Sequence, residues 1–253
     1  MTAPVHLRAT AFTHQGAARA GNEDSIALGD WVMSEPMPAP LMLERATGAP
    51  LIAVVADGMG GHAAGEVASR IAVERLTALA ARAVDEAALA RLLLDVNAEL
   101  FEAMREQPRL RGMGTTVAGL VIAPAGSLVF NVGDSRVYRI EGGALVQLST
   151  DDTPGPKLAD GRTAAMTSHV ITQTLGGAYE EIEIEPHLLG VPPAARERYL
   201  LCSDGLSDLL TRDEIEAELA ADDRSSVQAL FEAAMARGGR DNISIVMLDL
   251  RRP

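Results

Sequence analysis

The chain has 253 residues, of which 47% are hydrophobic and only 3% aromatic, so a large core must be filled mainly by aliphatic and alanine side chains. A net charge of −13 without a basic stripe disfavours a nucleic-acid partner and an anionic membrane surface. One cysteine, Cys202, excludes an internal disulfide, and no run approaches the ~20 apolar residues of a membrane span, so we expect a soluble cytoplasmic protein.

The N-terminal half is predicted to form strands and then two helices. Residues 7–13 are a strand candidate, and the proline-rich residues 33–50 are expected to be a surface excursion, either a docking surface or a tolerated insertion. LIAVVA (51–56) is the short apolar run of a strand buried on both faces. Apolar residues at helical spacing predict a helix over 68–79 and a second one from the N-cap Asp85 to residue 104.

The C-terminal half begins with three strand patterns, TTVAGLVIA, SLVFNV and VYRIEGGALVQL, the last with a hairpin turn at residues 141–143. Residues 153–167 are expected to form a loop. The patterns TRDE (211–214) and SSVQ (225–228) are capping boxes that each open a short helix, and ISIVMLDL (243–250) closes the chain as a strand. This order predicts two sheets with paired helices outside, in one large domain.

Aspartates recur at the predicted strand ends. Asp57 follows LIAVVA, Asp134 follows LVFNVG, Asp204 follows YLLCS, and Asp241 precedes ISIVML. Each alone is usually a turn former, but if they converge, two carboxylates 4 Å apart repel by about 4 kcal/mol at an effective dielectric constant of 20. A cluster therefore needs protons or cations. Oxygen ligands suit Mg²⁺ or Mn²⁺, and two such ions ~3.5–4 Å apart can activate a water between them.

Four glycines follow Asp57 closely in the stretch DGMGGHAAG. They would let a backbone carbonyl approach a metal and would leave room for a substrate, although a tight strand-to-helix connection would also explain them. The spacing GxGxxG and the pattern GxxxxGK[ST] are both absent, which disfavours a nucleotide site.

Six short motifs occur in a fixed order: RAGNED (19–24), DGMGGH (57–62), GTT (114–116), GDSR (133–136), SDGLSD (203–208) and DN (241–242). Together they resemble the bacterial type 2C (PPM family) metal-dependent serine/threonine protein phosphatases over nearly the whole chain. The resemblance implies an α+β fold, a four-layer α-β-β-α sandwich of two antiparallel β-sheets flanked by pairs of helices. It also implies that residues 1–253 form a single catalytic domain with metals at one end, between the sheets.

The resemblance assigns metal ligands to the motifs. Asp57 would bridge two Mn²⁺ or Mg²⁺ ions, Asp204 and Asp241 would hold the first, and Glu23 with the carbonyl of Gly58 would face the second.

A further set of acids extends this cluster in the family pattern. Asp24 resembles a member of the same shell, and Asp134 resembles the ligand of a third, weaker metal, with Asp204 shared and Asp208 nearby. The segment after the GDSR hairpin departs from the family, because Asp152 replaces a histidine and PGP at 154–156 leaves little room for a helix. This departure bears on substrate selection and on the third metal.

Two residues would act on the substrate together with Asp57. Arg19 stands where the family has a phosphate-binding arginine, whose planar fork can grip two phosphoryl oxygens; a solvated turn arginine is the alternative. His62 matches a proposed general acid for the leaving alkoxide; it could instead cap the next helix or fix the glycine loop. The implied mechanism is direct attack by a metal-bridging water, without a phosphoenzyme.

The implied partners are proteins phosphorylated on serine or threonine, with a bacterial Ser/Thr kinase as the opposing enzyme. We expect a monomer that binds neither nucleic acid nor membrane. Two alternatives remain: a catalytically silent phospho-sensor or binding module of the same fold, and a phosphatase that acts on a regulator in a partner-switching circuit.

Overall fold

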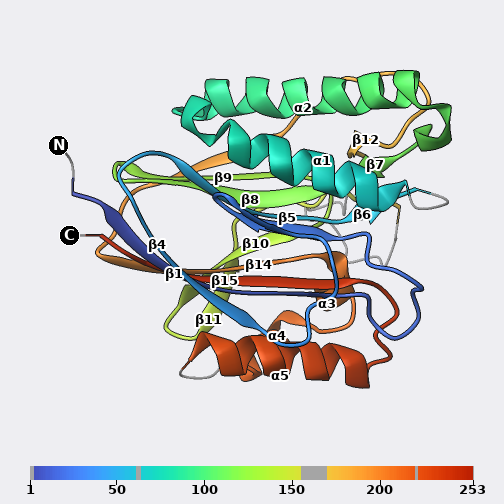
Figure 1. The fold of residues 1–253 in the computed structure, drawn as a ribbon. Coiled ribbons are helices and arrows are strands. Elements are labelled where there is room, and N and C mark those ends of the chain that lie inside the picture. The colour runs from blue at the N-terminus through green and yellow to red at the C-terminus, as the bar shows by residue number, and fades with distance from the viewer. Residues whose placement is uncertain (1–2, 61–63, 155–169, 220–221, 253) are drawn as a thin grey trace, which may run out of the picture.

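Two six-stranded antiparallel sheets lie face to face in the computed structural model, which describes residues 3–60, 64–154, 170–219 and 222–252 (Figure 1). The first sheet has the order β11 (Ala144–Gln147), β10 (Arg136–Glu141), β14 (Arg196–Cys202), β15 (Ile243–Arg251), β1 (Val5–His14) and β4 (Leu41–Thr47). The second has the order β13 (His187–Val191), β9 (Gly126–Val132), β8 (Val117–Ala123), β5 (Leu51–Ala56), β2 (Ser25–Leu28) and β3 (Trp31–Met33).

Helices cover both outer faces, so the molecule has four layers (Figure 1). The second sheet is covered by α1 (Gly65–Ala78) and α2 (Glu86–Glu106), and the first by α4 (Arg212–Ala217) and α5 (Asp223–Ala236). Shorter elements are α3 (Asp204–Ser207), the 3₁₀ turns η1 (Ala80–Arg82) and η2 (Pro108–Leu110), and a small sheet of β12 (Leu175–Gly176), β7 (Gly114–Thr115) and β6 (Gly58–Met59). The predicted four-layer α-β-β-α sandwich is confirmed.

Local capping explains where several helices begin. The Asp85 side chain accepts a hydrogen bond from the Ala88 N–H at 2.7 Å, and Thr211 and Glu214 form a reciprocal capping box, both as predicted. The predicted start at SSVQ is wrong. Helix α5 begins three residues earlier, because the N-cap is Asp222 and not Ser225. The Asp222 carboxylate accepts a hydrogen bond from the Ser225 N–H at 2.9 Å.

Two clusters of buried apolar side chains hold the layers together. One joins the facing surfaces of the two sheets and continues to α5, and the other lies between the second sheet and helices α1 and α2. Aliphatic residues dominate both clusters, as the low aromatic content requires. Burial of this apolar surface is the main term that stabilises the sandwich.

The interpretation of residues 33–50 as a surface excursion is wrong in part. Residues 41–47 form β4, which pairs with β1 from Leu41↔Ala11 to Thr47↔Val5 and closes one edge of the first sheet. Its residues are all partly or fully exposed, so it lacks the apolar alternation that marks a half-buried strand. Strand β13 and the small sheet were also not predicted, and the loop expected at 153–167 lies mostly outside the described residues.

The pairing of β1 with β15 brings residues far apart in sequence to the same end of the first sheet, with His14 opposite Ile243 and His6 opposite Arg251. The chain termini lie at the His6 end, and α3, β6 and β7 lie at the other (Figure 1). Among the described residues, no helix is both long and apolar enough to cross a membrane.

Candidate metal centre

The strand-end aspartates meet at the end of the sandwich away from the termini. Asp57 directly follows β5, Asp204 is the first residue of α3 just after β14, and Asp241 stands two residues before β15. The pKa of Asp57 is raised well above its ordinary value, chiefly by burial and then by the nearby charges of Asp24, Asp204 and Asp241. A hydrogen bond with Asp204 acts in the same direction. The structure thus brings these four carboxylates together.

The GTT motif fixes the backbone of Asp57. The Thr116 N–H and the Thr115 hydroxyl both donate to the Asp57 carbonyl at 2.9 Å, and the Asp57 N–H donates to the Thr116 hydroxyl at 3.2 Å. The Thr116 hydroxyl also contacts the Ser135 hydroxyl at 2.7 Å, which ties this motif to GDSR. The sequence alone had indicated no role for the two threonines of this motif.

Gly58 lies where two chain segments approach closely. A Cβ atom on Gly58 would clash with the carbonyl oxygens of Gly65 and Glu23. One on Gly65 would lie 2.8 Å from the Gly58 carbonyl carbon and 3.0 Å from the Glu23 carboxyl carbon. Glycine is therefore required at both positions by space, which agrees with the proposed approach of the Gly58 carbonyl and the Glu23 side chain to one ion.

Asp24 is fully buried and is held by two serine hydroxyls. Ser244 donates to Asp24 Oδ2 at 2.6 Å and Ser203 donates to the same oxygen at 2.9 Å. Burial raises the pKa of Asp24 to about 7 against these two hydrogen bonds, and the charges of Asp204 and Asp241 add to the rise. Ser203 and Ser244 were not predicted; Ser203 precedes Asp204, so this network also fixes the start of α3.

Asn242 joins the GNED turn to the start of β15. Its Oδ1 accepts from the Glu23 N–H at 2.8 Å, and its Nδ2 donates to the carbonyls of Gly21 at 2.9 Å and Gln15 at 3.1 Å. An amide side chain can do this because it both donates and accepts. The role of Asn242 in the DN motif is thus to position the loop that carries Glu23 and Asp24.

Asp134 belongs to a neighbouring acidic group. Burial raises its pKa to about 7, and the charges of Asp204, Asp208 and Asp151 act in the same direction, while a backbone hydrogen bond opposes them. Asp208 lies on the turn that ends α3, where its N–H donates to the Asp204 carbonyl at 2.8 Å. Asp134 therefore lies close enough to Asp204 and Asp208 for their charges to act on its carboxyl group.

The donor set fits a hard divalent cation. Within the described residues, Oδ1 of Asp24 and Oδ1 of Asp134 are buried without a hydrogen-bond partner, and such atoms are costly unless a proton or a cation serves them. The same part of the chain contains no three acidic, histidine or cysteine side chains already arranged around one metal position. Instead, Asp241 pairs with Arg19, and Asp24 accepts from serines.

Arg19 lies beside the cluster. Its Nη2 donates to Asp241 Oδ2 at 2.6 Å, its side chain is 51% exposed, and this hydrogen bond is the main cause that raises its pKa. The charges of Asp241, Glu23 and Asp57 act in the same direction. A guanidinium placed here, half in solvent at the rim of a group of carboxylates, can reach an anionic substrate that enters from outside.

The chain has five histidines, of which His62 is the predicted general acid. His62 and His169 lie outside the described residues. His14 packs against Phe12 and Phe231, and His187 pairs with Asp152 at 2.8 Å, so both make packing or structural contacts.

Cys202 is fully buried in β14. Burial raises the pKa of its thiol to about 12. A thiol protonated at neutral pH is a poor nucleophile, so Cys202 is unsuited to nucleophilic catalysis.

Comparison with known proteins gives one consistent family. The family model described as protein phosphatase 2C matches residues 41–244. The serine/threonine protein phosphatase PstP of Mycobacterium tuberculosis is 36% identical over 96% of this chain, which spans 45% of that relative's length. The serine/threonine phosphatase stp of Listeria monocytogenes is 32% identical over 78% of this chain and 84% of its own length.

Solved structures agree with this assignment. The M. tuberculosis PstP/Ppp structure superposes with a TM-score of 0.78 at 32% identity, covering 98% of this chain and 100% of that one. The PstP catalytic domain in complex with two manganese ions gives a TM-score of 0.79 at 33% identity over 98% and 99% of the two chains. Since both the family model and these relatives match most of its length, the chain belongs to the protein phosphatase 2C family.

Proposed function

We propose that this chain is a divalent-metal-dependent protein phosphatase that hydrolyses phosphoserine and phosphothreonine. The observation that carries the proposal is the convergence of Asp24, Asp57, Asp204 and Asp241 beside Arg19. The PstP catalytic domain, to which this chain is similar, was solved with two manganese ions, and this supports Mn²⁺ as one of the ions used here.

The proposed ligands divide into three groups. Asp57 would serve both ions, Asp204 and Asp241 would hold one of them, and Glu23 with the Gly58 carbonyl would hold the other. We further propose that Asp134, Asp204 and Asp208 provide a third, weaker site, that Asp24 supports the cluster, and that Mg²⁺ can replace Mn²⁺. When bound, the ions would lower the pKa of a water that attacks phosphorus and would offset phosphoryl charge.

Arg19 then binds the substrate. In the structure its Nη2 donates to Asp241, and within the described residues the other N–H groups of this half-exposed side chain donate to no protein acceptor. A phosphoryl group that enters the site can accept two parallel hydrogen bonds from this fork, which orients it for in-line attack and stabilises its developing charge. His62, in the DGMGGH motif, is proposed to give a proton to the leaving alkoxide.

We also propose a biological setting for this activity. The substrates are proteins phosphorylated on serine or threonine, and a bacterial Ser/Thr kinase opposes the enzyme in cytoplasmic signal transduction. Residues 1–253 act as one catalytic domain and as a monomer, without nucleic-acid or membrane partners.

A metal-dependence assay tests the activity directly. We expect hydrolysis of p-nitrophenyl phosphate and of a phosphothreonine peptide with Mn²⁺, and loss of both with EDTA or in Asp204→Asn. Asp213→Asn, on the exposed side of α4, is the matched control and should retain activity. Metal-saturated protein that turns over neither substrate would instead favour the silent phospho-sensor.

The role of His62 has its own test. In His62→Gln, turnover of alkyl phosphates should fall more than turnover of aryl phosphates, because aryl leaving groups need little help from an acid. Equal losses for both esters would remove the acid role and leave a structural one.

A further inference from the structure

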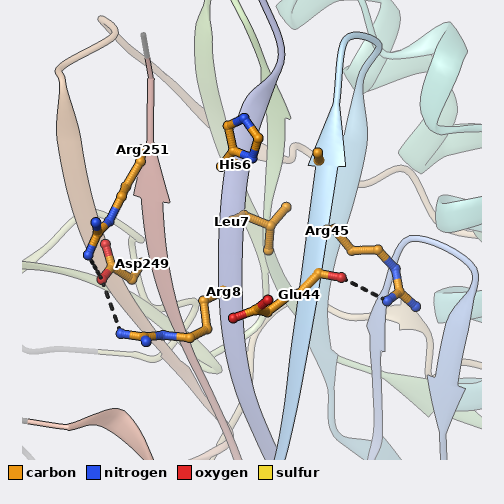
Figure 2. A pocket seen from close by; sticks show the side chains of 8 residues that line it. His6, Leu7, Arg8, Glu44, Arg45, Asp249 and Arg251 are labelled. Atoms are coloured by element: carbon orange, nitrogen blue, oxygen red, sulfur yellow. Dashed lines mark hydrogen bonds and ion pairs between the residues drawn. The ribbon is translucent and has the colours of Figure 1, made fainter.

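Three arginines converge on one carboxylate, Asp249, on the outer face of the first sheet, far from the metal centre. Figure 2 shows two of them, Arg8 and Arg251, beside Asp249. Arg196 makes a two-pronged contact, in which Nε donates to Asp249 Oδ1 at 3.0 Å and Nη2 donates to Oδ2 at 2.9 Å. Nη2 of Arg8 lies 3.5 Å from Asp249 Oδ2, and Nη2 of Arg251 lies 3.8 Å from the same oxygen. We call these four residues the arginine patch.

The strand register places them together. Arg8 is paired with Asp249 across β1 and β15, and Arg196 is paired with Arg251 across β14 and β15. Paired residues in antiparallel strands point to the same face of a sheet. On the next part of this face, Arg198 forms an ion pair with Asp223 at the first residue of α5, so the helix borders the patch on that side.

The patch carries excess positive charge toward solvent. The Asp249 side chain is only 2% exposed, whereas those of Arg8, Arg196 and Arg251 are 43%, 57% and 64% exposed. Burial alone would raise the pKa of Asp249. The hydrogen bonds from Arg196 and the charges of the three arginines outweigh burial, so the pKa lies below its ordinary value. One fixed negative charge thus lies beneath three positive ones.

This arrangement suits an anion better than scattered surface arginines do. Asp249 fixes the Arg196 guanidinium by two hydrogen bonds and attracts those of Arg8 and Arg251, so part of the entropy cost of gathering these positive charges is met before a ligand binds. Glu44, paired with Arg8 on β4, offsets part of the charge at one rim. On a chain with a net charge of −13, the patch is a place where an acidic polypeptide is attracted rather than repelled.

We propose that the arginine patch is a docking site for an acidic segment of the phosphoprotein substrate, a statement that rests on the proposed phosphatase function. Guanidinium forks match carboxylates in geometry, which favours Glu- and Asp-rich segments. Asp249 lies on β15 and follows Asp241, which stands two residues before that strand, by eight residues, so at the rise of an extended strand the two are at most about 27 Å apart. We therefore expect the acidic segment to lie about eight extended residues from the phosphorylated residue.

Paired peptides test this docking. Both carry one phosphothreonine sequence and a Gly/Ser linker of about 25 residues, whose root-mean-square length of about 25–30 Å matches the span. One ends in six Glu residues and the other in six Gln residues. We expect a KM about tenfold lower for the Glu-tailed peptide at low salt, and a smaller advantage at 0.5 M NaCl, because exposed charges are screened.

The matched variants are two arginine pairs. In Arg8→Gln/Arg251→Gln the ratio of the two KM values should fall to about one; Arg196 is kept so that Asp249 stays paired and the sheet stays folded. Arg70→Gln/Arg91→Gln removes the same charge from exposed positions of α1 and α2 over the other sheet, and the ratio should persist. Thermal unfolding confirms that both variants are folded.

A binding arm separates this proposal from the phosphatase function. Fluorescence anisotropy of a labelled, unphosphorylated Glu-tailed peptide needs no turnover, so it reports on docking even if the protein is not an enzyme. Equal KM values for the two peptides, or equal loss of binding in both double variants, would overturn the proposal. Tighter binding of a single-stranded oligonucleotide at the same arginines would also overturn it, since the patch would then select polyanions and not acidic protein segments.

Discussion

The guanidinium of Arg19 donates to the carboxylate of Asp241 at 2.6 Å, so the proposed phosphate-binding residue contacts a proposed metal ligand. The contact crosses 222 positions of sequence and joins the RAGNED and DN motifs. It keeps Arg19 at the rim of the acidic cluster before any substrate arrives. Such placement in advance reduces the ordering cost of substrate binding.

The first prediction follows from this contact. In Arg19→Ala, KM should rise and kcat/KM should fall about 10- to 100-fold, the size expected for loss of a charged hydrogen bond to phosphate. Mn²⁺ binding measured by calorimetry should persist, because the carboxylates remain. Arg19→Lys should recover only part of the loss, since an ammonium lacks the planar fork. An unchanged KM in Arg19→Ala would remove the phosphate role.

The second prediction concerns pH and metal together. Burial raises the pKa values of Asp24 and Asp134 to about 7, so between about pH 4 and pH 7 the folded state holds protons that the unfolded chain has released. In EDTA, these two groups therefore make the free energy of unfolding fall as pH rises through that window. Bound Mn²⁺ should raise the melting temperature more at pH 8 than at pH 5.5, because at pH 8 fewer protons compete with the metal ion for these carboxylates.

Asp24→Asn isolates one of these groups. The variant carries no proton to release at position 24, so the fall in stability between pH 4 and pH 7 in EDTA should be smaller than in the unmodified chain. Chemical denaturation at several pH values measures it. If the free energy of unfolding fell with pH equally in the two proteins, Asp24 would not titrate between pH 4 and pH 7.

Short-range patterns predicted much of this fold because their causes are local. Asp85 and Thr211 cap helices through bonds that span three residues, and the hairpin at residues 141–143 needs only the positive φ angles of Gly142 and Gly143. The two-sheet arrangement followed from the order of elements, and the resemblance supplied its layers. These parts of the prediction depended on few distant contacts.

The parts that failed depend on contacts between distant segments. Strand β4 forms because β1 offers it an open edge, and nothing in its exposed sequence marks that edge. The site was predicted as a set of acids, but the groups that hold them were not. Asn242 and Ser244 act through hydrogen bonds across about 220 residues, which no local spacing in one sequence can indicate.

The third prediction tests the close packing at Gly58. Gly58→Ala should destabilise the fold by about 1–3 kcal/mol, because the new Cβ would press on the Gly65 and Glu23 carbonyls and force the backbone apart. It should also weaken Mn²⁺ binding, since Glu23 would move. Gly21→Ala is the control in the neighbouring turn, where a Cβ meets nothing within 4 Å, and should change stability by no more than about 0.5 kcal/mol. Urea unfolding and calorimetry measure both effects; equal behaviour of the two variants would contradict the packing argument.

The fourth prediction concerns Asp152, the residue that departs from the family pattern. Its Oδ2 accepts from the Gly133 N–H at 2.8 Å and from Gln173 at 3.0 Å, and its Oδ1 contacts His187 Nε2 at 2.8 Å. The carboxylate therefore holds the turn that carries Asp134 against β13 and the residues before β12.

Asp152→Ala would leave several of these donors without an acceptor, at a cost of about 1–3 kcal/mol for each one that stays buried. We expect lower stability in urea and a weaker Mn²⁺ response at the weakest site in a titration, since Asp134 would lose its support. Asp152→Asn keeps one side-chain oxygen as an acceptor, so it should lose less stability and less of the Mn²⁺ response than Asp152→Ala. If Asp152→Ala matched the unmodified chain in both measurements, the Asn131 bonds to Thr150 and Gly133 and the backbone bond from the residue 152 N–H to the Gly133 carbonyl would be enough to hold the turn, and the carboxylate at position 152 would have no part in placing Asp134.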